Sequence, residues 1–330
     1  MYHRTPARIG RPISVVGLGT WQLGADWGQV SEDGARNVLE TALESGVTFF
    51  DTADVYGDGR SEQLVGQFLA AHDDAELTVA TKMGRRVAQV PENYVAENFR
   101  TWADRSRKNL RVDRLDLIQL HCPPGEVISA DATYDALDAL VEDGVVARYG
   151  VSVETCAQAL TAIARPHVAS VQIILNAFRL KPLDEVVPAA ARAGVAIIAR
   201  VPLASGLLSG NYDENTTFTS DDHRSYNRDG SAFDVGETFS GVDYVTGVRA
   251  ARDFADLVES LAHGITPAQA AIAWVWQQPG VSTVIPGARN EAQARGNAVA
   301  GRSAELGEDF NAGVRNIYDR YFRATVHQHW

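Results

Sequence analysis

The chain has 330 residues, of which 42 are Asp or Glu and 30 are Lys or Arg, so its formal net charge is −12. Lys and Arg form no long run, and we therefore expect neither nucleic acid nor an anionic membrane surface as a partner. No apolar stretch approaches the roughly 20 residues that a membrane span requires, whereas a hydrophobic content of 45% is typical of a globular protein with a full core.

The cysteines and the opening segment predict a cytoplasmic protein. Cys122 and Cys156 are too few for a disulfide framework and lack metal-ligand spacing, as is usual in a reducing compartment. Residues 1–12 lack the uninterrupted apolar core of a secretory signal. We expect both thiols to be buried packing groups, with a reactive Cys122 beside His121 as the alternative.

Strand-like and helix-like segments alternate along most of the chain. After an opening segment that could form a small hairpin come short, β-branched segments that are apolar on both faces, as buried parallel strands are. The predicted strands are residues 15–19, 48–51, 78–82, 115–121, 148–151, 170–174, 196–200 and 282–286.

Segments with the apolar spacing of helices follow each predicted strand. Ser31, Thr155 and Thr266 are suitable helix caps, and Gly144 and Gly194 stand where helices should end. The predicted helices are residues 32–44, 62–71, 94–110, 130–142, 155–164, 183–193, 245–262 with 267–278, and 291–300.

Eight strand–helix pairs favour a single (β/α)8 barrel over a doubly wound sheet, which typically has fewer strands. No boundary divides the chain, so residues 1–330 are expected to form one domain. Residues 211–243 have no sustained period and are predicted to form a long loop after strand seven. The aromatic residues Tyr226, Phe233 and Phe239 favour an ordered lid there.

Four polar residues lie at or just after predicted strand ends: Asp51, Tyr56, Lys82 and His121. Each alone could be a turn or packing residue, but the carboxyl ends of parallel strands meet at one end of a barrel, so we expect one site. A cation beside a phenol lowers the pKa of the phenol, and a neutral imidazole can donate to a carbonyl oxygen. This set favours a redox or proton-transfer enzyme that protonates an alkoxide, or deprotonates an alcohol in reverse.

Nine motifs spread over nearly the whole chain carry a resemblance to a known family. They are G-L-G-T-W at 17–21, F-F-D-T-A-D-V-Y-G at 49–57, S-E-Q-L-V-G at 61–66, T-K-M at 81–83, L-D-L-I-Q-L-H at 115–121, G-V-S at 150–152, V-Q at 171–172, P-L-A-S-G-L-L-S-G at 202–210 and I-P-G-A-R at 285–289. Together they resemble the aldo-keto reductases. That family implies a (β/α)8 barrel that binds NADPH across the strand ends and exchanges hydride with aldehydes, ketones or the corresponding alcohols.

The resemblance implies distinct catalytic roles. Tyr56 is similar to the general acid of the family, Lys82 and Asp51 to the pair that lowers its pKa, and His121 to the residue that orients the carbonyl group. It also implies a substrate pocket whose walls include Trp21, Tyr56, His121 and Trp330. Trp330 would be a gate on a C-terminal tail that covers the pocket, with a frayed terminus as the alternative.

The resemblance further implies how NADPH is held near the reacting carbon. Ser152 and Gln172 match residues that bind the carboxamide, with Val153 in place of a usual Asn that Asn176 could replace. Arg200 would stack on the nicotinamide and could favour the reduced cofactor or reach an acidic substrate. The cofactor residues of this end are Gly19, Thr20, Trp21, Asp51, Ser152, Gln172 and Arg200.

The phosphate and adenosine ends follow in the same way. Arg289 would bind the 2′-phosphate, and Asn211 replaces a frequent Lys, so Arg224 or Arg228 could close the lid. Some family members carry Lys-Ser where this chain has Gly287-Ala288, and Arg where it has Gln293. NADP is therefore the expected cofactor, and these departures leave the use of NAD open. The residues implied are Pro202, Leu203, Ser205, Gly206, Ser209, Gly210, Gly287, Arg289, Gln293 and Asn297.

Two other classes of protein are compatible with parts of this pattern. Channel β-subunits share this barrel and cofactor but act mainly by interaction. A metal-assisted hydrolase or lyase would use His121 and Asp51, but no further ligand accompanies them with metal spacing, so we expect no metal. The expected partner is a small-molecule carbonyl compound or sugar. The substrate, the reaction direction and the oligomeric state stay open, because they depend on the loops after strands one and four, the lid and the tail.

Overall fold

The computed structural model describes residues 1–24 and 30–330. Its eight parallel strands form one sheet in the order β10-β9-β8-β7-β6-β5-β4-β3. The two edge strands meet, because isolated bridges pair Val16 with Val284 and Gly19 with Gly287. The sheet therefore curls into the predicted (β/α)8 barrel, which is confirmed. The strands are β3 (Leu18–Gly19), β4 (Phe49–Asp51), β5 (Thr78–Met83), β6 (Leu117–His121), β7 (Tyr149–Ser152), β8 (Val168–Ile174), β9 (Ala196–Arg200) and β10 (Val281–Val284).

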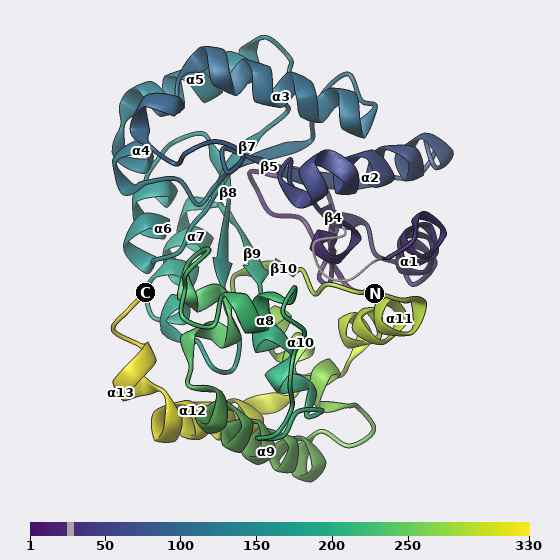
Figure 1. Ribbon diagram of the computed structural model, residues 1–330, viewed down its shortest axis with the longest axis vertical. Coiled ribbons are helices and arrows are strands. Elements are labelled where there is room, and N and C mark those ends of the chain that lie inside the picture. The colour runs from purple at the N-terminus through teal and green to yellow at the C-terminus, as the bar shows by residue number, and fades with distance from the viewer. Residues whose placement is uncertain (25–29) are drawn as a thin grey trace.

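Helices surround the strands on the outside (Figure 1). The predicted caps form: the Ser31 hydroxyl accepts from the Gly34 amide, and Thr155 and Thr266 each close a capping box with a Gln three residues later. The helices that follow the strands are α1 (Glu32–Glu44), α2 (Arg60–Ala71), α3 (Ala96–Leu110), α5 (Asp131–Glu142), α6 (Cys156–Ile163), α7 (Val186–Ala193), α9 (Tyr244–Leu261), α10 (Pro267–Gln277) and α11 (Glu291–Val299).

Among the described residues, four helices lie outside the predicted pairs: α4 (Gly125–Ser129), α8 (His223–Tyr226), α12 (Gly307–Tyr321) and α13 (Arg323–Val326). The longest, α12, packs against α9 through an apolar stripe that includes Phe310, Val314 and Tyr318. These spacings of four residues are helical, but they follow the last strand–helix pair, where the barrel pattern no longer predicts an element. Two of the predicted helices, α3 and α7, start two or three residues later than expected. Short 3-10 turns, Pro91–Asn93 and Lys181–Leu183, precede them.

A hairpin closes the N-terminal end of the barrel. Strand β1 (His3–Arg4) pairs antiparallel with β2 (Ile13–Ser14), as the opening segment suggested. Ile9 and Ile13 are buried in one apolar cluster with side chains from the barrel strands. The other members of that cluster are Phe49, Ala80, Leu117, Ala169, Ala196, Ile198 and Ile285. The barrel interior is therefore filled mainly by apolar side chains, together with a buried hydrogen bond from Ser170 on β8 to Gln119 on β6 at 3.4 Å.

The segment after β9 is folded. Residues 211–243 contain α8 and two 3-10 turns, Val235–Glu237 and Phe239–Gly241, and Phe239 is buried. The Ser205 hydroxyl accepts from the Phe239 amide at 2.9 Å, which ties this lid to the loop that follows β9. We call residues 211–243 the lid from here on.

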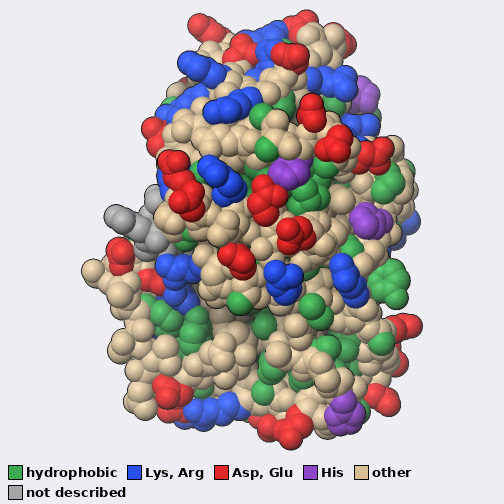
Figure 2. Space-filling view, turned by 90° about the vertical axis from the view of Figure 1, so that its right-hand side faces the viewer, with side chains coloured by type: hydrophobic (Ala, Val, Ile, Leu, Met, Phe, Trp, Pro, Cys, Tyr) green, Lys and Arg blue, Asp and Glu red, His purple; other side chains and the backbone are tan. Residues whose placement is uncertain are grey.

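The surface carries charges of both signs. Figure 2 shows acidic and basic side chains interspersed over the face on which α1, α2 and α11 lie. None of the described helices is long and apolar enough to cross a membrane.

Candidate active site

The four predicted polar residues converge at the C-terminal ends of neighbouring strands. Asp51 ends β4, Lys82 lies on β5 and His121 ends β6, while Tyr56 begins the 3-10 turn Tyr56–Gly59. Lys82 Nζ donates to Asp51 Oδ1 at 2.5 Å, to the Thr52 carbonyl at 2.8 Å and to the Tyr56 hydroxyl at 3.3 Å. One buried ammonium group therefore joins the carboxylate to the phenol.

The carboxylate of Asp51 is fixed on both sides. Its Oδ1 accepts from Lys82, and its Oδ2 accepts from Gln172 Nε2 at 2.8 Å. Although burial alone would lower the pKa of Lys82, Asp51 and Tyr56 raise it above its usual value, so the amine stays protonated. Gln172, which the resemblance assigns to the cofactor carboxamide, is thus also the residue that orients Asp51.

Tyr56 is held as a neutral phenol. Burial raises the pKa of Tyr56 above 10, and the opposing effect of Lys82 is the smaller of the two. From the sequence we expected Lys82 to lower the pKa of Tyr56, and the direction found is the opposite. The reason is that a sequence pattern shows the neighbouring charge but not the desolvation that opposes it. A phenol that keeps its proton at neutral pH can act as a general acid, and the adjacent ammonium group stabilises the phenolate that forms when the proton leaves.

His121 is neutral as well. Burial, followed by the charges of Arg85, Lys82 and Arg200, lowers the pKa of His121 well below its usual value. Its ring lies edge-on to the Tyr56 ring, with centroids 6.0 Å apart. Its Nδ1 has no hydrogen-bond partner among the described residues. A neutral imidazole and a phenol thus lie together, as donors to one carbonyl oxygen need to.

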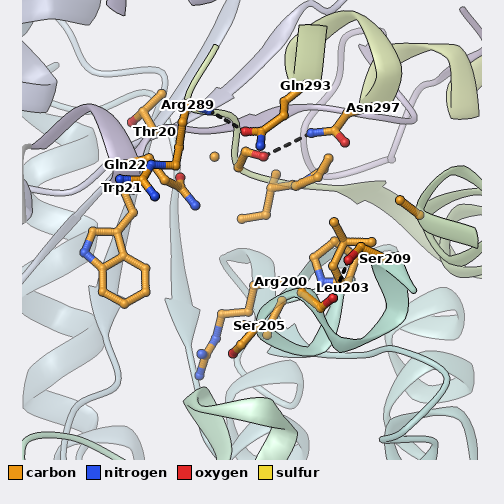
Figure 3. A pocket seen from close by; sticks show the side chains of 18 of the residues that line it. Thr20, Trp21, Gln22, Arg200, Leu203, Ser205, Ser209, Arg289, Gln293 and Asn297 are labelled. Atoms are coloured by element: carbon orange, nitrogen blue, oxygen red, sulfur yellow. Dashed lines mark hydrogen bonds between the residues drawn. The ribbon is translucent and has the colours of Figure 1, made fainter. Parts of the chain in front are cut away.

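A cavity of about 550 Å³ extends from Tyr56 and His121 to the start of α11. Figure 3 shows Arg289, Gln293 and Asn297 on one side of it, with Leu203, Ser205 and Ser209 facing them across the space. Most residues that the resemblance assigns to the cofactor line this cavity: Gly19, Thr20, Trp21, Asp51, Gln172, Arg200, Pro202, Leu203, Ser205, Gly206, Ser209, Gly287, Arg289, Gln293 and Asn297.

Two assigned cofactor residues, Ser152 and Gly210, are not among the lining residues. Ser152 is buried, and its hydroxyl lies 3.5 Å from the Cys122 sulfur. Asn176, offered as a substitute contact, instead donates to the Val201 carbonyl and to the Ser240 hydroxyl. Both residues therefore serve the packing of the strand ends in this structure.

Side-chain contacts fix the end of the cavity near α11, where the resemblance places the adenosine group. The Arg289 amide donates to Gln293 Oε1 at 2.9 Å, and Asn297 Nδ2 donates to the Gly287 carbonyl at 3.0 Å (Figure 3). Gln22 was not predicted, yet it lines the same region and fills the space that a Cβ at Gly287 would occupy. Its position directly after Trp21 is the signal that could have found it.

Of the two lid arginines expected near the cofactor, Arg224 lines the cavity and Arg228 does not. Arg224 lines it and is held by Asp222, whose Oδ1 accepts from Arg224 Nε at 2.8 Å. Arg228 does not line it and lies over the Tyr244 ring, 5.0 Å from the centroid. The loop after strand one was expected to influence substrate choice. Residues 25–29 of that segment lie outside the described residues, so this role stays a prediction.

Trp330 packs behind the lid and does not line the cavity. Its indole N–H donates to Asp234 Oδ1 at 3.0 Å, and the Arg179 guanidinium lies 4.0 Å from the ring centroid. A Cβ at Gly236 or Gly241 would come within 2.9 or 2.2 Å of the indole. Trp330 is therefore buried and supports the lid. It neither covers the substrate pocket as a gate nor belongs to a frayed terminus.

Three charged residues around Arg200 escaped the sequence interpretation. Arg85 contacts Glu237 at 2.8 Å and Glu154 at 3.3 Å, and Arg200 contacts Glu154 at 2.8 Å and Glu237 at 3.8 Å. We call these four residues the ion quartet. Arg85 and Glu154 follow strand ends, which is the signal that could have found them, whereas Glu237 comes from the lid.

The quartet also decides two questions about Cys122. Its sulfur and the carboxylates of Glu154 and Glu237 lie within 4.8 Å of one another, a spacing that could suit a metal. Both carboxylates already pair with arginines, and burial raises the pKa of Cys122 to about 12, which disfavours the thiolate that a metal ligand or a nucleophile requires.

A closed barrel with a tyrosine, lysine, aspartate and histidine at its C-terminal strand ends defines a barrel oxidoreductase. The chain belongs to the aldo/keto reductase family, whose model matches residues 15–319, and the resemblance is confirmed. An uncharacterized oxidoreductase of Mycobacterium tuberculosis is 32% identical over 87% of this chain and 84% of its own length. The glycerol dehydrogenase of Gluconobacter oxydans superposes with a TM-score of 0.78 at 30% identity, covering 97% of this chain and 95% of the other.

A further solved structure shares the fold. It is an aldo-keto reductase from Klebsiella pneumoniae in complex with NADPH, with a TM-score of 0.71 and 22% identity, covering 96% of each chain.

Proposed function

We propose that this protein is an NADP(H)-dependent oxidoreductase that interconverts an aldehyde or ketone with the corresponding alcohol or sugar alcohol, with Tyr56 as general acid and base. The proposal rests on Lys82, which lies 2.5 Å from Asp51 and 3.3 Å from the Tyr56 hydroxyl. The Lys82 ammonium group stabilises the phenolate of Tyr56 more than its neutral phenol, so its effect is greatest once the proton has been transferred.

The residues account for the proton in each direction. When bound, the reduced nicotinamide supplies a hydride to the carbonyl carbon, and the carbonyl oxygen gains negative charge. His121 and the Tyr56 hydroxyl donate to that oxygen, and Tyr56 transfers its proton to give the alcohol. Lys82 stabilises the resulting phenolate until a proton from water restores it. In oxidation, the phenolate removes the proton of the alcohol.

The residues along the cavity fit an extended dinucleotide. Arg289 offers a guanidinium group to a 2′-phosphate. Ser205 and Ser209 lie on the opposite wall; their hydroxyls donate to the Glu237 and Gly206 carbonyls in this structure and would have to turn to donate to phosphate oxygens. Buried polar atoms of three lining residues, Gln22 Oε1, His121 Nδ1 and Arg200 Nε, have no hydrogen-bond partner among the described residues, as expected of groups that serve a ligand. The presence of Arg289 favours NADP, and use of NAD stays open.

The decisive experiment measures NADPH oxidation with a panel of small aldehydes, sugars and ketones for the wild type and for Tyr56→Phe. We expect turnover by the wild type, a loss of about 10²–10⁴-fold in the variant, and unchanged quenching of protein fluorescence by NADPH. A variant that keeps its turnover would show that Tyr56 is not the acid.

The same assay separates the alternative of a cofactor-binding regulatory subunit of the channel β-subunit type. Such a protein would bind NADPH but show little turnover with any member of the panel. The cytoplasmic location and the single domain over residues 1–330 are further proposals, supported by the two unpaired cysteines and by the continuous strand–helix alternation.

A further inference from the structure

Glu237 places a fixed carboxylate beside the reacting groups. It belongs to the 3-10 turn Val235–Glu237 of the lid and lines the cavity together with Tyr56, His121 and Arg200. Its negative charge also acts on Tyr56, whose pKa it raises, which agrees with its place in the cavity. The lid therefore contributes a charged group to the wall that a substrate faces.

The position of Glu237 is determined from two sides. Asp234 caps the turn by accepting from the Gly236 amide at 2.7 Å, and its carboxylate is held in turn by the Trp330 indole at 3.0 Å. The backbone carbonyl of Glu237 accepts from the Ser205 hydroxyl at 3.3 Å. A side chain anchored in this way is a fixed feature of the wall, as a group that selects substrates must be.

The charge of Glu237 is set by the two arginines. Burial would raise its pKa, but Arg85 and Arg200, with a smaller contribution from a hydrogen bond with Glu154, lower the pKa of Glu237 to about 2, so the side chain is a carboxylate at neutral pH. The nearest contacts are 2.8 Å to Arg85 and 3.8 Å to Arg200. The position at which two guanidinium groups would bind the carboxylate of an acidic substrate is thus occupied by a carboxylate of the protein itself.

We propose that Glu237 is a specificity-determining residue that excludes carboxylated carbonyl compounds and accepts a hydrogen bond from a hydroxyl group of an uncharged, hydroxylated aldehyde or ketone. Exclusion follows because a second carboxylate would meet a like charge while both arginines are already paired. Preference for hydroxyls follows because a fixed carboxylate strengthens a bond from an O–H donor and leaves a cost when an apolar group replaces that donor. This inference rests on the proposed carbonyl reduction at Tyr56, and it replaces the expectation that Arg200 reaches an acidic substrate.

Three four-carbon aldehydes test it: D-erythrose, butanal and succinic semialdehyde. They differ in carrying hydroxyl groups, no polar group, or a carboxylate. For Glu237→Gln, which keeps the shape and removes the charge, we expect kcat/KM for D-erythrose to fall at least about tenfold relative to butanal. We expect kcat/KM for succinic semialdehyde to rise at least about tenfold relative to butanal, because Arg85 and Arg200 gain a free pairing position.

Glu154→Gln is the matched control. Glu154 pairs with the same two arginines at 3.3 and 2.8 Å but does not line the cavity. It should leave the D-erythrose to butanal ratio close to that of the wild type. If Glu237→Gln lowers kcat/KM for all three aldehydes equally, Glu237 only supports the lid and the proposal is overturned; unchanged values for all three overturn it as well. Absence of butanal turnover in the wild type would instead count against the carbonyl reductase assignment itself.

Discussion

Replacement of Lys82 by Met should separate the structural effect of the buried ion pair from its catalytic effect. The substitution removes three contacts of Nζ: 2.5 Å to Asp51, 2.8 Å to the Thr52 carbonyl and 3.3 Å to Tyr56. The side chains of Lys82 and Asp51 are only 1% and 3% exposed, so the remaining carboxylate cannot regain its hydration. Loss of one partner from such a pair costs about 3–5 kcal/mol of unfolding free energy.

The same substitution removes the cation that stabilises the Tyr56 phenolate. We expect kcat to fall by about 10²–10⁴-fold, the usual contribution of general acid–base catalysis. The double variant Lys82→Met with Asp51→Asn should recover most of the lost stability, since a neutral amide no longer leaves a buried charge unpaired. It should not recover turnover, because the phenol still lacks its cation.

Urea unfolding followed by fluorescence measures the stability of the three proteins, and NADPH oxidation measures their turnover. For Lys82→Met, binding of NADPH, followed by fluorescence quenching, serves as the control for an intact site and should change little. The reasoning would be refuted by a single variant that loses no stability, or by a double variant whose kcat returns toward that of the wild type.

Two further predictions concern the cofactor and the pH dependence of stability. Arg289→Leu should raise the KM for NADPH much more than the KM for NADH, because only the former carries the 2′-phosphate; equal changes in steady-state assays with the two cofactors would contradict that role. Burial and the charge of Glu62 raise the pKa of Asp54 to about 7, whereas an exposed Asp titrates near 4. A raised pKa means that the folded state holds the proton more tightly, so stability is fully present below pH ~4 and is lost as the pH rises through about 7. Asp54→Asn should remove this loss, and urea midpoints at several pH values that fall in parallel for both proteins would speak against it.

Much of the fold could be predicted from sequence, because buried parallel strands and amphipathic helices leave strong local periods. The convergence of the four residues that we propose as catalytic could be predicted too, since each stands at or just after a strand end and the topology brings those ends together. Helix α12 escaped because it follows the last repeat of that pattern. The direction of the Tyr56 pKa shift escaped because it depends on burial, which no local motif encodes.

The ion quartet shows a different limit. Arg85 and Glu237 are separated by 152 residues, and Glu237 lies in a lid segment without any period. Such a residue meets its partners only when the lid packs on the barrel, and Trp330 supports the lid from behind. Contacts of this kind are properties of the tertiary structure, so they were found only in the folded chain.

The hairpin at the N-terminal end of the barrel has a consequence for how protons travel. Ile9 and Ile13 close that end, and Phe49, Ala80 and Leu117 belong to the same apolar cluster within the strands. Among the described residues, this apolar cluster separates the N-terminal end of the barrel from the polar strand ends. If Tyr56 is the acid that we propose, we expect its proton to be replaced from the cavity side, so that protons and substrates share one entrance and the proton returns through the opening by which the product leaves.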